Sequence, residues 1–237
     1  MNSAMNERPD LNQLTEQIKY IIKSKDWYSL TESNRFIWEE SVKLMAAMIS
    51  KEIKEVSPEQ IKEIIESSFT EEALSVAGSR YFIDCLLEID PKMILWSEGD
   101  PAWQKTKAAK SGLTNREGVR ATFISKNKTA NLTNIILSLA NEMGEEVCVV
   151  VIDDKEKNLA QAASLQDAVT GVGITIQTYQ LNLSDINSDP TACLKFLEGI
   201  KAKNIKLIVD MDGVLVNTDR VLLETVSQKI AELLLYT

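Results

Sequence analysis

Apolar residues in the first part of the chain recur every three or four positions, which is the spacing of one face of an α-helix. Ser57-Pro58-Glu59-Gln60 is a typical helix start, because the serine hydroxyl can cap, proline fits the first turn and Gln60 completes a capping box. The pattern predicts an all-helical region over residues 1–90. Its apolar positions include Leu11, Leu14, Ile18, Ile21, Ile22, Trp38, Val42, Met45, Ile49 and Ile53.

The pattern changes after Pro91, where short apolar runs rich in β-branched residues alternate with helical segments. This alternation favours a parallel sheet covered by helices on both faces. We therefore predict an α/β protein whose residues 91–213 form a Rossmann-like three-layer α/β/α core with a five-stranded parallel sheet. The helical pattern returns over 214–237, which we expect to complete an all-helical cap with residues 1–90. The five expected strands are 93–96, 119–124, 147–152, 173–179 and 205–209.

The amino-acid composition excludes several classes of active site and makes some partners unlikely. The chain of 237 residues has no histidine, which excludes Ser-His-Asp and Cys-His triads and most zinc sites. Its net charge of −9 disfavours nucleic acid as a partner. Three scattered cysteines without CxxC spacing indicate thiols in a reducing compartment. With no signal peptide and no apolar stretch of membrane-spanning length, we expect a cytoplasmic protein without a membrane partner.

Polar residues follow the expected strands, and ligands of open parallel sheets bind beyond the carboxyl ends of the strands. Asp210 and Asp212 follow the last strand, and residues two apart in extended backbone point the same way. Gly213 then lets the chain turn close to a bound group. Asp153-Asp154 follows another strand, and neighbouring carboxylates repel unless a cation or a shared proton relieves them. The pattern indicates metal-assisted phosphoryl chemistry.

Four segments resemble the motifs of the haloacid dehalogenase-like (HAD) hydrolase superfamily, most of whose members are magnesium-dependent phosphatases. Asp210-Met211-Asp212-Gly213-Val214-Leu215-Val216-Asn217-Thr218 is similar to the first motif. Leu95-Trp96-Ser97-Glu98-Gly99-Asp100, with Gln104 and Lys107 downstream, resembles the second. Lys128 suits the third, and Asp153-Asp154 with Asn158 suits the fourth. The first motif comes last here, so the resemblance implies a circular permutant whose new ends lie inside the helical cap.

The resemblance implies a catalytic role for two aspartates. Asp210 would be the nucleophile that forms an aspartyl-phosphate, and Asp212 would be the general acid and base. Ser97, Glu98 and Lys128 would lie at the phosphate, although Lys126, two residues away, is an alternative to Lys128. The expected substrate is a small phosphorylated metabolite.

The resemblance also implies an Mg²⁺ cofactor, a hard cation that prefers oxygen ligands. It would be held by Asp210, Asp212, Asp153 and Asp154, with Asp212 contributing its backbone carbonyl oxygen.

Two other interpretations stay open at this point. An acidic pair followed by a later phospho-acceptor aspartate also resembles a response-regulator receiver, although a receiver needs further strands after the acceptor and leaves Asp212 without a role. A relative that kept the fold and the magnesium site could also serve only in binding. The sequence does not identify the substrate or the oligomeric state.

Overall fold

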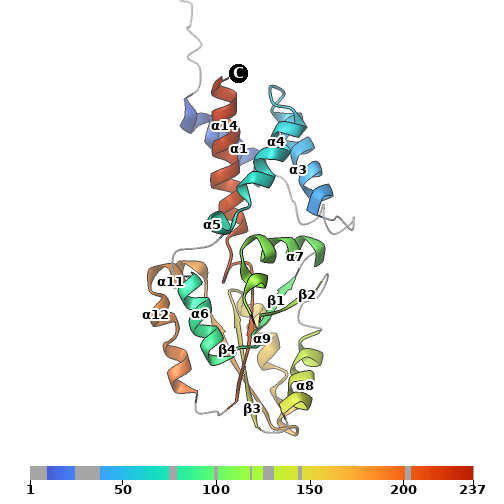
Figure 1. Cartoon of the computed structure of the whole chain (residues 1–237), viewed down its shortest axis with the longest axis vertical. Helices are drawn as coiled ribbons and strands as arrows, with labels where there is room; N and C mark the ends of the chain where they lie inside the picture. Colours follow the sequence, from blue (N-terminus) through green and yellow to red (C-terminus); the bar gives the residue numbers. More distant parts are fainter. Residues whose placement is uncertain are drawn as a thin grey trace, which may run out of the picture. The chain divides into compact units, whose positions relative to one another are not determined.

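A computed structural model describes residues 10–24, 38–74, 79–98, 101–117, 119–124, 131–143, 146–200 and 204–236. Tertiary contacts divide the chain into two compact units. The helical unit comprises Met1–Phe69 and Thr218–Thr237, and the sheet unit comprises Thr70–Asn217. The two ends of the chain therefore contribute to one unit, while the middle of the chain forms the other (Figure 1).

The sheet unit is built on a five-stranded sheet in which all paired neighbours are parallel, in the order β2-β1-β5-β3-β4. The last strand in the sequence, β5, therefore lies in the middle of the sheet, between β1 and β3. The expected strands are present, with ends that differ by about two residues or fewer. Their bounds are β1 Ile94–Glu98, β2 Arg120–Ile124, β3 Val147–Asp153, β4 Ile174–Gln180 and β5 Ile205–Val209.

Helices cover both faces of this sheet, which explains why its central strands β3 and β5 are mostly apolar. All residues of β3 are buried, and because strand side chains alternate between faces, Val150 and Ile152 enter one core while Val149 and Val151 enter the other. The first core also contains residues of α6 Ser79–Ile89, α11 Leu183–Ser188 and α12 Pro190–Cys193. The second core contains residues of α8 Leu132–Met143, α9 Glu156–Ala163 and α10 Gln166–Thr170. Figure 1 shows α6, α11 and α12 gathered on one side of the sheet, with α8 on the other.

The boundary between the units differs from the one expected at residue 90. Helix α6 and the short α5 Glu71–Leu74 belong to the sheet unit. The reason is packing: Phe82 and Leu86 of α6 are fully buried in the same core as Leu95 and Leu207 of the sheet. An amphipathic pattern predicts that a helix buries one face, but it does not identify the surface that covers that face.

Helix α7 Pro101–Lys110 follows β1 and contacts both β1 and β2. Gly112, two residues beyond its end, has φ of 74°, the left-handed conformation common after a helix. The short helices η1 Leu113–Asn115 and η3 Lys195–Gly199 complete the sheet unit's described elements.

The described regular elements of the helical unit are all helices: α1 Leu11–Lys23, α3 Trp38–Glu52, α4 Pro58–Ser68, α13 Thr218–Arg220, the π-helical segment η4 Val221–Val226 and α14 Ser227–Tyr236. The capping box predicted at Ser57 is present, with the Gln60 backbone N–H donating to the serine hydroxyl at 3.2 Å. Helix α1 packs along α14, and α4 contacts η4, so N-terminal and C-terminal segments share one core. Among the described helices, none combines the length and apolar character needed to cross a membrane.

Candidate metal centre

The central feature of the sheet unit is the meeting of two strand ends. The backbone N–H of Asp210, the residue after β5, donates to the carbonyl of Ile152 in β3 at 2.8 Å. The register pairs Ile152 with Val209, which brings Asp210 beside Asp153. Both aspartates are buried, at 4% and 0% exposure. Two carboxylates are therefore fixed next to each other at the carboxyl edge of the sheet.

A third carboxylate joins them. Asp153, Asp154 and Asp210 each offer an oxygen, and these oxygens lie within 4.8 Å of one another. Burial raises the pKa of Asp154 above its usual value, and the negative charge of Asp153 raises it further, although nearby Lys155 acts in the opposite direction. The Oδ1 atom of Asp154 is buried and has no hydrogen-bond partner among the described residues. An all-oxygen donor set with an unused buried oxygen suits a hard divalent cation.

Asp153 is held by the turn that leads into α9. Its Oδ1 accepts from the Lys155 backbone N–H at 2.9 Å, and the Asn158 side-chain amide lies 3.0 Å from both carboxylate oxygens. Asn158 stands near the start of α9, so the first turn of that helix sets the orientation of Asp153. The segment 153–158 thus forms a local support for one side of the carboxylate cluster.

The loop after β5 forms the other side of the cluster. Two backbone N–H groups, of Leu215 and Val216, donate to the Met211 carbonyl at 2.9 Å, and this closes a tight turn. Gly213 lies inside the turn with φ of 86°. A Cβ at this position would stand 2.5 Å from Oδ2 of Asp154, so the loop approaches the cluster at a distance that only glycine permits.

The Asp212 side chain has a different partner from the carboxylate cluster. Its Oδ2 forms an ion pair with the Lys107 ammonium of α7. Lys107 is almost completely buried, with 3% of its side chain exposed, whereas the Asp212 side chain is 31% exposed. The sequence offered a signal for Lys107, since it belongs to the segment that resembles the second motif, but the resemblance assigned this lysine no role. In the structure Lys107 lies one turn after Gln104 and next to Ala108, on the buried side of α7.

The residues expected at the phosphate are described in part. Ser97 is buried, and Leu95 pairs with Val209, so Ser97 lies at the same edge of the sheet as the loop after β5. Glu98 is exposed, and its carbonyl accepts from the Gln104 side-chain amide at 2.8 Å. Lys126 and Lys128 lie outside the described residues. The structure thus brings together Asp153, Asp154 and Asp210, and it joins Asp212 to Lys107.

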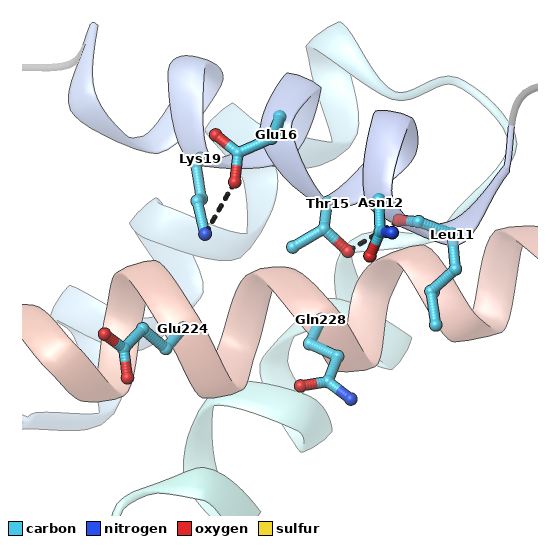
Figure 2. Close-up of a pocket in the computed structure, with 7 residues that line it drawn as sticks. All are labelled: Leu11, Asn12, Thr15, Glu16, Lys19, Glu224 and Gln228. Carbon is cyan, nitrogen blue, oxygen red and sulfur yellow. Dashed lines mark hydrogen bonds and ion pairs between the residues drawn. The ribbon is translucent and has the colours of Figure 1, made fainter.

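A groove lies within the helical unit, between α1 and the segment formed by η4 and α14 (Figure 2). It measures about 360 Å³ and is open to solvent. Its polar groups interact mainly along their own helix: Lys19 pairs with Glu16 at 2.7 Å and lowers the pKa of that carboxyl, and the Thr15 hydroxyl donates to the Leu11 carbonyl. This groove holds no set of converging charges, so the carboxylate cluster is the stronger candidate. The groove is lined by Leu11, Asn12, Thr15, Glu16, Lys19, Glu224 and Gln228.

Fold and site together define an α/β protein with a cluster of carboxylates at the carboxyl edge of a parallel sheet. No family model, curated protein or solved structure matches the chain.

Proposed function

We propose that the chain is an Mg²⁺-dependent phosphatase that hydrolyses a small phosphomonoester through an aspartyl-phosphate, as a circularly permuted relative of the HAD-like hydrolases. The observation that carries this proposal is the convergence of Asp153, Asp154 and Asp210 from two adjacent strands. Strand β5, which precedes the first motif, pairs with β1 and β3, which precede the second and fourth. Segments that are far apart in the sequence thus meet at one edge, as the permutation requires.

The residues present fit the cation. The carboxylates of Asp153, Asp154 and Asp210 and the backbone carbonyl of Asp212 would hold Mg²⁺. The bound cation would supply positive charge that relieves the repulsion among the carboxylates and lets a phosphate dianion approach them. The unpartnered buried oxygen of Asp154 supports this assignment, since an anionic oxygen in that position needs a cation or a donor.

The chemistry then uses the chain's own residues in two steps. A carboxylate oxygen of Asp210 bonds to phosphorus while the bond from phosphorus to the alcohol oxygen breaks, and Asp212 gives its proton to that oxygen. In the second step Asp212 takes a proton from water as the water oxygen attacks phosphorus. The bond from phosphorus to Asp210 breaks, which releases inorganic phosphate and restores both carboxyl groups. Ser97 and a lysine after β2 would bind the remaining phosphoryl oxygens, where transition-state charge accumulates.

The helical unit would serve as a cap that selects the substrate. One observation supports this part of the proposal: the described elements of the helical unit are all helices, and they come from both ends of the chain. The carboxylate chemistry would then be common to related enzymes, while residues of the cap would discriminate among phosphorylated metabolites.

The proposal is tested by assaying phosphate release from a panel of small phosphomonoesters, with Mg²⁺ and with a chelator. We expect Mg²⁺-dependent release by the wild type and its loss in Asp210→Asn. No release from any substrate, or unchanged release by the variant, contradicts the enzyme assignment. Acetyl phosphate separates the alternatives: a single persistent phosphorylation per chain would indicate a receiver, and Mg²⁺ binding without phosphorylation or turnover would indicate a binding protein.

A further inference from the structure

Lys107 is the charged group in the site whose presence the proposed chemistry leaves unexplained. The Lys107 side chain is 3% exposed, so its ammonium group loses much of its hydration, and a buried cation is tolerated only where anionic partners compensate it. Asp212 supplies such a partner. Since α7 and the loop after β5 are about a hundred residues apart in sequence, this ion pair ties two separate segments of the site together.

The sheet unit contains a second buried ion pair, between Lys206 and Asp90, which serves as a structural comparison. Asp90 is 1% exposed and accepts from Lys206 at 2.8 Å, from the Leu207 backbone N–H at 2.9 Å and from the Lys92 backbone N–H at 3.0 Å. In that pair the acid is the enclosed member and its oxygens are occupied by the protein. In the pair of Lys107 and Asp212 the lysine is the more buried side chain, and the aspartate is the one that solvent or a ligand can reach.

We propose that Lys107 is a positioning residue that holds the Asp212 carboxyl group against the leaving-group oxygen. This inference rests on the proposed function, in which Asp212 is the general acid and base. Helix α7 provides a fixed base for the lysine, because Gln104, one turn earlier, binds the Glu98 carbonyl at the end of β1 at 2.8 Å. The buried ammonium would fix Oδ2 of Asp212, which leaves the other oxygen to carry the proton for the leaving group.

The inference predicts a dependence on the leaving group. Transfer of a proton to the departing oxygen matters most for an alkyl phosphate, whose alkoxide leaves poorly, and little for p-nitrophenyl phosphate, whose phenolate leaves without a proton. Replacing Lys107 by methionine keeps the length of the side chain and removes its charge. We expect Lys107→Met to lower kcat/KM about tenfold or more for an alkyl phosphate and about threefold or less for the aryl phosphate.

The experiment compares wild type, Lys107→Met, Lys107→Arg and Lys105→Met on the two substrates. Lys105 is exposed on the same helix, so its variant should match the wild type. Arginine keeps the charge and should restore part of the alkyl-phosphate activity. Inorganic phosphate should inhibit the wild type and Lys107→Met with the same inhibition constant, and Mg²⁺ should raise the melting temperature of both equally. If Lys107→Met does not fold, Lys107→Gln provides the same comparison.

The outcomes separate this inference from the proposed function. A wild type that hydrolyses neither substrate overturns both. An active wild type with equal losses on the two substrates in Lys107→Met overturns only the positioning role, because a structural defect does not distinguish leaving groups. Weaker inhibition by phosphate with kcat unchanged also overturns it, since Lys107 would then bind the substrate's phosphate.

Discussion

Substitution of Gly213 tests the proposed metal centre directly, because a methyl group added there would collide with one identified side chain, that of Asp154. In Gly213→Ala the new Cβ would stand 2.5 Å from Oδ2 and 2.8 Å from Cγ of Asp154. Both distances are far below ordinary van der Waals contact, so the Asp154 side chain has to move or the loop has to shift. A movement of Asp154 changes its position relative to Asp153 and Asp210, and a shift of the loop disturbs the segment that follows Asp210.

Two costs contribute to the expected effect. The φ of 86° at Gly213 puts the substituted residue in the left-handed region, which costs about 1–2 kcal/mol for a residue with a Cβ. The collision with Asp154 adds to this by displacing a carboxylate of the cluster. We expect Gly213→Ala to lower the free energy of unfolding by about 2–3 kcal/mol. We also expect its Mg²⁺ affinity to fall by about 10- to 100-fold, the range seen when the support of a metal ligand is disturbed.

Two other glycines provide matched controls. Gly173 has φ of 75°, but among the described residues its Cβ would meet only the Glu146 Cα at 3.9 Å, so Gly173→Ala carries the backbone cost without a displaced carboxylate. Gly171 has no positive φ and nothing within 4 Å of its Cβ, so Gly171→Ala should be neutral or stabilising by about 0.4–1 kcal/mol.

The assay combines urea unfolding without metal, which reports stability, with the rise in melting temperature on Mg²⁺ titration, which reports affinity. Gly213→Ala and Gly173→Ala should both lose stability, and only Gly213→Ala should lose Mg²⁺ affinity. Equal Mg²⁺ affinities of these two variants would refute the reasoning that Gly213 makes room for a metal ligand.

Three further predictions follow from the same contacts. Asn158→Leu removes the amide that orients both oxygens of Asp153 and should lower Mg²⁺ affinity about tenfold, measured by the same titration. Folding raises the pKa of Asp154 above its ordinary value of 3.8. The contribution of Asp154 to the free energy of unfolding is therefore most favourable below pH 3.8, and it is lost as the pH rises through the raised pKa. Metal-free Asp154→Asn should therefore be more stable than wild type near pH 7 in urea unfolding, and the difference should vanish towards pH 4. Asp90→Ala leaves the Leu207 N–H without its acceptor and should cost about 1–3 kcal/mol while Mg²⁺ affinity stays unchanged, because Asp90 contacts the amino end of β5.

The sheet and its acidic ends could be predicted from the sequence for a definite physical reason. A strand buried on both faces is apolar along most of its length, as β3 is from Val147 to Ile152, so the polar residue that follows, Asp153, marks the strand's end. In a parallel sheet those ends lie at one edge, which places Asp153 and Asp210 in the same region before any coordinates are known. Their contact further depends on β3 and β5 being neighbours, which the alternation of strands and helices does not specify.

Lys107 and the boundary between the units show where such reasoning stops. The pattern of α6 predicts a buried face, but the covering surface is a property of the tertiary fold, and it proved to be the sheet. The burial of Lys107 depends on a carboxylate about a hundred residues away, and no local pattern records that partner. Long-range pairs of this kind are therefore accessible from the structure and not from periodicity.

The three carboxylates of the cluster differ in how firmly the protein holds them, and this difference assigns them different parts in cation binding. Asp153 is fixed through Asn158, and Asp210 is fixed by the backbone bond to Ile152. Asp154 has an unpartnered oxygen and a raised pKa, so it carries the electrostatic cost of the metal-free cluster. Asp154 already lies against the Gly213 turn, one residue from Asp212, and a bound cation would relieve this cost there. Under the proposed function, cation binding at Asp154 would therefore be coupled through that turn to the position of Asp212.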